Sequence, residues 1–148
     1  MIYRLRDLPL TAVVTLVTES ERSGLRFVRR LTDEWVSGAN RFDQPGEGLF
    51  AAMVDGHVVG LCGLNVDPYT AEGRVGRVRH LYVMEASRRH GIGRRLVAEV
   101  IAAARDSFDR LRLRTANPEA ARLYEGLGFA PCAGEADCTH ALDLRVTR

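Results

Sequence analysis

The sequence predicts an α/β fold in which helices pack against a mixed sheet. Two patterns alternate along the chain: runs rich in β-branched and aromatic residues, which are typical of strands, and apolar residues at helical spacing. Their order is one strand, two helices, three strands, a helix, a strand, a helix and two strands. With 148 residues, 46% of them hydrophobic, the chain can bury a core without disulfides or metals, so we expect a single domain over residues 1–148.

The first third of the chain is expected to form one strand and two helices. Residues 2–6 alternate in polarity and predict a strand, and the turn after it leads into a helix over residues 11–21. The next segment, residues 37–48, is rich in turn-forming residues and predicts a loop. Between them, a helix over residues 24–35 is predicted by helically spaced apolar side chains, namely Leu25, Val28, Leu31 and Trp35.

The middle of the chain predicts a hairpin, a third strand and a helix. Apolar strands over residues 49–54 and 57–65 are separated by Asp55-Gly56, a dipeptide that strongly predicts a two-residue hairpin turn. Residues 78–84 are β-branched and aromatic enough to predict the next strand. From Ile92 onward the apolar residues recur at helical spacing, so a helix with one apolar face is expected to begin there.

The last third adds a strand, a helix and two short strands. Residues 111–115 alternate in polarity. Asn117 and Pro118 suit the N-cap and the first position of a helix, which should end at the glycines of residues 126–128. Residues 129–130 and 139–146 are expected to form the final strands.

The junction before the helix at Ile92 carries two glycines, Gly91 and Gly93, among arginines. The first N–H groups of a helix lack partners, and the helix dipole is positive at that end. Because glycine has no side chain to block the approach, an anion can reach these N–H groups. The junction therefore predicts a phosphate site.

Two nucleotide-binding motifs do not fit this junction. A Walker A loop needs a lysine, and all 21 cationic side chains of the chain are arginine. A dinucleotide fingerprint needs glycine or alanine where Leu96 stands. The remaining pattern, Arg/Gln-x-x-Gly-x-Gly/Ala, is carried by Arg88, Gly91 and Gly93, and it resembles the acetyl-CoA pyrophosphate loop of the GNAT superfamily of N-acetyltransferases.

A second motif supports the same resemblance. The run from Asn117 to Phe129, which contains Ala120, Tyr124 and Gly128, resembles the GNAT motif that follows the fifth strand. The resemblance implies the GNAT fold, an α/β arrangement with a mixed, mostly antiparallel sheet of six to seven strands. About four helices would flank this sheet, and it would splay at its central parallel pair.

The resemblance also implies how acetyl-CoA, the co-substrate, is bound. Backbone groups of the splayed strand would pair with the pantetheine arm, and the loop amides would hold the pyrophosphate. No metal is expected. The implied cofactor-binding residues are Leu81, Val83, Arg88, Arg89, His90, Gly91, Ile92, Gly93, Arg94, Asn117, Ala120 and Tyr124.

Two of these residues are also implied in catalysis. Attack on a thioester needs a deprotonated amine held close to the carbonyl carbon and a fixed N–H donor for the oxyanion. The N–H of Val83 is the candidate donor. Tyr124 would reach the thioester sulfur and donate to the departing thiolate.

The general base stays open. Some family members carry a glutamate on the strand before the loop, whereas this chain has no carboxylate there. A lone histidine in a strand is more often packed than catalytic, so packing is expected for His80. The remaining candidates are Glu85, Asp67, Tyr69 and water.

Composition and the N-terminal sequence limit the classes of partner and the cellular compartment that we expect. A net charge of +2 with dispersed arginines argues against a nucleic-acid partner, and no apolar run approaches the roughly 20 residues of a membrane span. The N-terminus lacks a signal peptide, so we expect a cytoplasmic protein. Cys62, Cys132 and Cys138 lack Cys-x-x-Cys spacing and are expected to be thiols, with neither a disulfide nor a zinc site.

These observations lead to the hypothesis of an acetyl-CoA-dependent N-acetyltransferase acting on an amine of a small molecule, protein or peptide. One alternative enzyme would use another acyl-CoA. A catalytically weak CoA-binding regulatory module is the alternative from a different class. The acceptor is not identified by any motif, and a homodimer is considered because the final strands often mediate dimers in the family.

Overall fold

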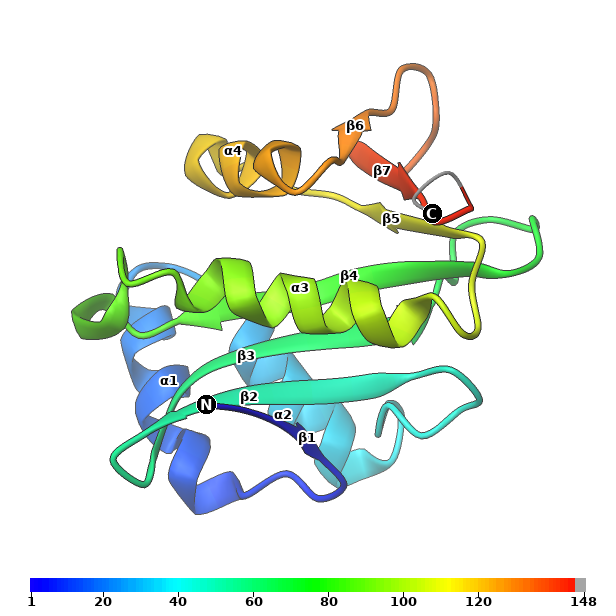
Figure 1. Cartoon of the computed structure of the whole chain (residues 1–148). Coiled ribbons are helices and arrows are strands. Elements are labelled where there is room, and N and C mark those ends of the chain that lie inside the picture. The colour runs from blue at the N-terminus through cyan, green and yellow to red at the C-terminus, as the bar shows by residue number, and fades with distance from the viewer. Residues whose placement is uncertain (146–148) are drawn as a thin grey trace.

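The protein is described here from a computed structural model, which covers residues 1–145 (Figure 1). The strands and helices follow the predicted order. They are β1 (Ile2–Leu5), α1 (Leu10–Arg22), α2 (Phe27–Ser37), β2 (Gly48–Val54), β3 (His57–Val66), β4 (Val75–Val83), η1 (Glu85–Ser87), α3 (Ile92–Ala104), β5 (Arg110–Leu113), α4 (Pro118–Gly126), β6 (Ala130–Pro131) and β7 (His140–Asp143).

The sheet has seven strands in the order β1-β2-β3-β4-β5-β7-β6. Neighbouring strands are antiparallel except β4 and β5, which are parallel. The parallel ladder is short, because only Val75 to Arg77 pair with Arg110 to Arg112. Beyond that ladder the two strands diverge (Figure 1). The predicted mixed, mostly antiparallel sheet with a splayed parallel pair is thus confirmed.

Helices cover both faces of the sheet and bury separate cores. α1 and α2 pack on one face through Val13, Leu16 and Leu31. α3 packs on the other face, where its buried side chains include Leu96 and Val100 (Figure 1). The apolar face of α3 is the one that the helical spacing predicted, and Val28 and Leu31 of the predicted second helix are buried, whereas Leu25 lies before α2 and is exposed. No helix within residues 1–145 is both long and apolar enough to cross a bilayer.

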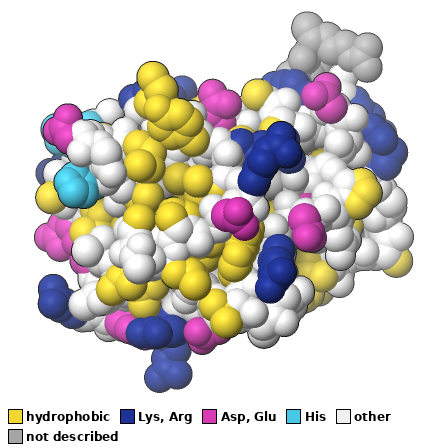
Figure 2. Space-filling view, turned by 90° about the horizontal axis from the view of Figure 1, so that it is seen from below, with side chains coloured by type: hydrophobic (Ala, Val, Ile, Leu, Met, Phe, Trp, Pro, Cys, Tyr) yellow, Lys and Arg dark blue, Asp and Glu magenta, His cyan; other side chains and the backbone are white. Residues whose placement is uncertain are grey.

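The β2–β3 hairpin turns at Asp55 and Gly56 as predicted. Both residues have positive φ, 50° and 79°, which is the requirement of a type I′ turn. At the outer edge of the sheet, β1 has a single neighbouring strand, β2. Exposed hydrophobic side chains at this edge include Met1, Tyr3 and Val54, and Figure 2, which views the molecule from below, shows a band of hydrophobic surface.

Several element bounds differ from the predictions. α2 begins at Phe27 instead of residue 24, because Gly24 has a φ of +79° and ends the preceding turn. β4 begins at Val75, before the predicted residue 78, because Gly76 lets Leu111 and Phe108 approach its backbone. The last strand ends at Asp143, and Val146 of the predicted strand lies outside the described residues.

β4 contains a bulge that the sequence did not reveal. Leu61 pairs with Tyr82 and Gly63 with Arg79, so Cys62 faces two residues, His80 and Leu81. His80 has a φ of +60°, which is unusual for a residue other than glycine. The bulge lies just after the point where the ladder with β5 ends at Arg77. A bulge bends its strand and increases the local twist, so this bulge helps β4 to turn away from β5.

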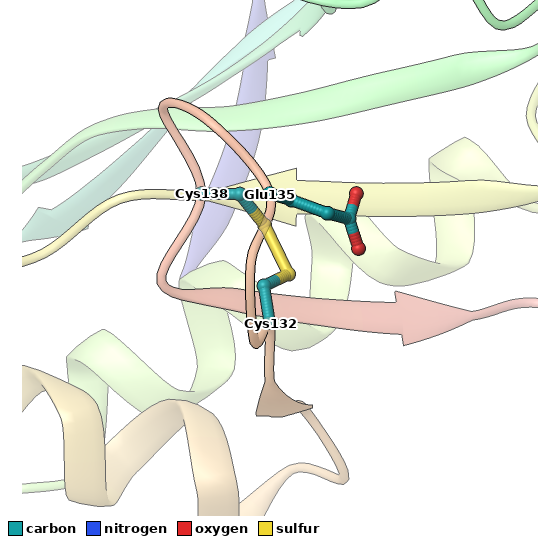
Figure 3. Close-up of side chains that lie close together, drawn as sticks. All are labelled: Cys132, Glu135 and Cys138. Carbon is teal, nitrogen blue, oxygen red and sulfur yellow. A yellow bond between two sulfur atoms is a disulfide. The ribbon is translucent and has the colours of Figure 1, made fainter.

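The expectation of free thiols at Cys132 and Cys138 is wrong. Their sulfur atoms lie 2.18 Å apart and form a disulfide (Figure 3). The pairing depends on the turn between β6 and β7, where the N–H of Cys132 donates to the carbonyl of Thr139 at 2.9 Å. Spacing along the chain alone does not show that contact. Cys62 is a free, buried thiol, as expected.

Candidate functional site

The end of β4 offers backbone groups that β3 does not use. The N–H of Met84 donates to the carbonyl of Val59 at 2.7 Å. Because facing residues in an antiparallel ladder alternate between bonded and non-bonded pairs, the peptide groups of Val83 point away from β3. They point to the side on which the ladder with β5 has already ended at Arg77. The splay therefore leaves an unpaired strand edge at Val83. The side chain of Leu81, in the bulge, packs into the α3 core.

The amides of the glycine loop are not used by the hydrogen bonds of the fold. Arg89 and Gly91 have φ values of 68° and 77°, and Gly91 is the N-cap of α3. Within residues 1–145, no backbone or side-chain atom accepts a hydrogen bond from the amides of residues 89–94, which include His90 and Ile92. A Cβ built on Gly91 meets no atom within 4 Å. Successive N–H groups without acceptors at a helix N-terminus are the kind of arrangement that binds anions.

Gly93 has a different reason to be glycine. A Cβ at this position would lie 3.2 Å from Cδ1 of Leu123 in α4. The absence of a side chain thus lets α4 pack closely on the first turn of α3. Arg94 also reaches α4, because its Nη1 lies 3.4 Å from a Cβ built on Gly126.

Arg88 does not point toward the loop amides. Its Nε donates to the carbonyl of Val83 at 2.8 Å, and its guanidinium lies 5.4 Å from the centre of the Tyr82 ring. Its Nη2 is 4.0 Å from Oε1 of Glu19. The Arg88 side chain, which the resemblance placed among the cofactor-binding residues, therefore occupies a strand carbonyl that the resemblance assigned to pantetheine.

A pocket of about 350 Å³ adjoins the loop on the side of β1 and β2. His90, Ile92 and Arg95 line it together with the ends of these two strands. His90 thus borders a hollow on the opposite side of the loop from β5.

The start of α4 is capped as the sequence predicted. Oδ1 of Asn117 accepts hydrogen bonds from the N–H groups of Glu119 at 2.9 Å and Ala120 at 3.3 Å. This cap fixes the first turn of the helix. Ala120 packs at the edge of the α3 core and Tyr124 lies one turn further along.

Tyr124 is buried, with 6% of its surface exposed, and its ring meets Phe129 edge to face at 5.5 Å. Burial raises the pKa of its phenol far above the ordinary value, and neighbouring Cys62 raises it further. The hydroxyl therefore stays protonated at physiological pH. It can act as a hydrogen-bond donor to a developing thiolate.

His80 is placed as a packed residue. Its ring lies between those of Phe27 and Phe42, at centroid distances of 6.3 and 6.1 Å. Burial, together with nearby Arg79 and Arg30, lowers its pKa to about 3, although the backbone of Phe27 partly opposes this. Neither ring nitrogen has a hydrogen bond of normal geometry within residues 1–145. A histidine ring with a pKa of about 3 is a poor proton acceptor near neutral pH.

Asp67 belongs to a buried ion-pair cluster, and the exposed Tyr69 contacts it. Oδ2 of Asp67 lies 3.2 Å from Nη1 of Arg77 and 3.8 Å from Nε of Arg112, and all three side chains are at least nine-tenths buried. Oδ1 accepts from the N–H of Tyr69 at 2.8 Å, and the Tyr69 ring lies 4.6 Å from the Arg77 guanidinium. Both carboxylate oxygens of Asp67 are thus already engaged, one by two guanidiniums and the other by a backbone N–H.

Glu19 is the residue that sequence reasoning missed. Its Oε1 accepts from the hydroxyl of Tyr82 at 2.5 Å and from the N–H of Glu85 at 2.9 Å. Burial raises the pKa of Tyr82 to about 12, and the hydrogen bond to Glu19 adds to the shift. A signal was present, since Glu19 lies three residues after buried Leu16 on the face of α1 that meets the sheet. Glu19 places a carboxylate beside the free end of β4.

One cluster has the spacing of metal ligands. Ligand atoms of Cys132, Glu135 and Cys138 lie within 4.8 Å of one another. The two sulfurs, however, are bonded to each other, and the Glu135 carboxylate pairs with Arg110 at 2.5 Å. Because these interactions use the donor atoms and place a cation beside them, we do not interpret the cluster as a metal centre.

Comparison with known proteins gives a consistent result. The family model described as "Acetyltransferase (GNAT) family" matches residues 13–129. A protein from Exiguobacterium sp. assigned as an acetyltransferase has a structure with a TM-score of 0.85 and 29% identity, and the match covers 100% of this chain and 98% of that one. The ribosomal-protein-alanine N-acetyltransferase of Brucella melitensis shares the fold at a TM-score of 0.70 and 21% identity, over 97% and 96% of the two chains.

A partial match includes a bound cofactor. Rv2747 from Mycobacterium tuberculosis, whose structure was solved in complex with CoA, matches with a TM-score of 0.50 and 26% identity. The match covers 60% of this chain and 51% of that one.

Proposed function

Because the chain belongs to the GNAT acetyltransferase family, we propose that it transfers an acetyl group from acetyl-CoA to an amine by direct attack in a ternary complex. The observation that carries the proposal is the run of free amides at residues 89–94, beside the unpaired edge of β4 at Val83. Free amides suit a pyrophosphate, and an unpaired strand edge suits the amide groups of pantetheine.

In this proposal the thioester lies between the ends of β4 and α4. The N–H of Val83 donates to the oxyanion, and its carbonyl accepts from pantetheine, for which Arg88 must release it. Tyr124 donates to the sulfur as the thiolate leaves, which its permanently protonated phenol permits. The chain's own groups thus position the reactants and stabilise developing charge.

Proton removal from the amine is assigned to water. Two of the candidates are unsuited, since the ring of His80, with a pKa of about 3, stays neutral near pH 7 and the carboxylate of Asp67 is paired with two arginines. Glu19 has a partly exposed carboxyl group, but it already accepts from Tyr82 and Glu85. We propose that it attracts the protonated amine to the cleft before water takes the proton.

The second candidate function is a CoA-binding module with little catalysis, which the lack of a free carboxylate on β4 favours. Incubation with acetyl-CoA and a panel of amines, with chromatographic measurement of CoA, separates the two. Amine-dependent release of CoA is expected from the enzyme. Tight CoA binding without release would contradict the transferase proposal. A parallel series with propionyl-CoA and longer acyl-CoAs tests the choice of donor.

A further inference from the structure

The loop between β6 and β7 is closed by the disulfide of Cys132 and Cys138, whose Cα atoms lie 6.0 Å apart (Figure 3). The two cysteines differ in their surroundings. Cys132 is partly exposed and lines a pocket of about 480 Å³, whereas Cys138 is buried at 8% exposure. Cys132 is therefore the more accessible of the two cysteines.

Arg110 places a positive charge beside the sulfur of Cys132. Its Nη2 lies 3.9 Å from Sγ of Cys132 and also pairs with Glu135. Cys138 instead directs its sulfur to the carbonyl of His140 at 3.4 Å. A neighbouring guanidinium favours a thiolate over a thiol, and the thiolate is the reactive form. An accessible cysteine beside a cation, with a second cysteine next to it, is the arrangement of reversible redox sites.

The closed loop is held by three arginines at alternate positions, two on β5 and the third just after it. Arg110 pairs with Glu135 at 2.5 Å, Arg112 donates to the carbonyl of Ala136, and Arg114 lies 3.7 Å from Asp137. Arg112 also belongs to the buried cluster around Asp67. The disulfide loop is therefore connected to the β4–β5 pair, next to the point where these strands diverge.

We propose that Cys132 and Cys138 form a reversible thiol–disulfide site, in which Cys132 is the sulfur that reacts with external oxidants and reductants. In oxidation, the Cys132 thiolate attacks the terminal oxygen of a hydroperoxide, the O–O bond breaks, the other oxygen leaves as water or an alcohol after taking a proton from solvent, and Cys132 becomes a sulfenic acid. The Cys138 thiol then bonds to that sulfur and water leaves. In reduction, one thiolate of an external dithiol attacks Cys132 and frees Cys138. The second thiolate closes the dithiol's own disulfide and releases the Cys132 thiolate beside Arg110.

The first test uses the full chain, reduced with dithiothreitol, freed of reductant and exposed to iodoacetamide at pH 7. Mass spectrometry of peptides follows each cysteine separately. Cys132 should react about ten times faster than Cys138, while buried Cys62 stays unmodified and reports that the protein is folded. Equal rates at Cys132 and Cys138, or a faster Cys138, would overturn the proposal.

Variants of the β5 arginines separate the charge effect from loop packing. Arg110→Ala should slow alkylation of Cys132 by about five-fold or more, whereas Arg110→Lys should retain most of the rate. Arg114→Ala is the matched control, because Arg114 contacts the same loop but no sulfur. If Arg110→Ala and Arg114→Ala slow the reaction equally, the guanidinium does not activate Cys132.

A second measurement tests reversibility. Hydrogen peroxide added to the reduced chain should produce the Cys132–Cys138 cross-link, and dithiothreitol should remove it. Cleavage after Glu135 by a glutamate-specific protease should be several-fold slower in the oxidised chain, since the loop is then closed. Peroxide that yields no cross-link contradicts the proposal. None of these measurements involves acetyl transfer, so the redox site and the transferase proposal can fail independently.

Discussion

Replacement of Gly91 by glutamate tests the assignment of the phosphate site. Gly91 has a φ of +77°, a conformation that costs a residue with a side chain about 1–2 kcal/mol. Gly91→Ala bears the same backbone cost as Gly91→Glu, and neither new Cβ touches the protein. The two variants should therefore lose similar stability. They differ in the length and charge of the new side chain.

The negative charge that Gly91→Glu adds should make its CoA affinity lower than that of Gly91→Ala. A carboxylate about 5 Å from one phosphate charge repels it by roughly 3 kcal/mol at an effective dielectric constant of about 20, which corresponds to about 100-fold in Kd. Gly91→Ala, which adds only a methyl group, should bind CoA much more tightly than Gly91→Glu. Isothermal titration calorimetry with CoA measures the affinities, and thermal unfolding measures the stability of each variant.

A second glycine supplies the control. Gly56, in the β2–β3 turn, has a φ of +79°, and a Cβ built there also meets no atom within 4 Å. Gly56→Glu should therefore lose stability in the same way and retain CoA affinity. If Gly91→Glu binds CoA as tightly as Gly91→Ala, the loop amides do not hold the phosphates and the reasoning is refuted.

Three further predictions concern catalysis, the buried cluster and pH. Tyr124→Phe should lower kcat by about 10- to 100-fold with little change in the Kd of acetyl-CoA, because only the hydroxyl that donates to the leaving thiolate is lost; unchanged kcat would assign Tyr124 to packing. Asp67→Asn should lower the free energy of unfolding in urea by about 3–5 kcal/mol, since two buried arginines lose their counter-charge. Asp109→Asn, which breaks an exposed pair, should cost less than about 1 kcal/mol, and equal losses would contradict the burial argument. The unfolded chain binds a proton at His80 near pH 6.5 and the folded chain only near pH 3, so stability should fall as pH drops through this window. His80→Phe should flatten that part of the stability curve, and an unchanged slope would count against the assigned pKa.

Local patterns predicted most of the fold. The Asp55-Gly56 turn, the apolar face of α3 and the Asn117 cap are each set by residues close together in the chain, and each was found as predicted. The sequence did not predict that Gly76 lies inside a strand, because glycine is more typical of turns and loops than of strands. Its role depends on Leu111 and Phe108, which approach it only after β5 has paired with β4.

The candidate site was predicted less completely than the fold. The sequence located the glycine loop, but it could not show that Arg88 folds back onto Val83. It proposed Asp67 as a base without its two arginine partners, which lie on two other strands, β4 and β5. It also treated Cys132 and Cys138 as separate thiols, because their contact depends on the β6–β7 turn.

The sequence by itself determined the order of elements, the family and the loop whose amides are free for an anion. It could do so because capping, turn formation and helical periodicity depend on neighbours within a few residues. The tertiary structure decided which charges pair, which tyrosine is buried and which sulfurs bond. These depend on distances between segments far apart in the chain, and burial and charge act through those distances.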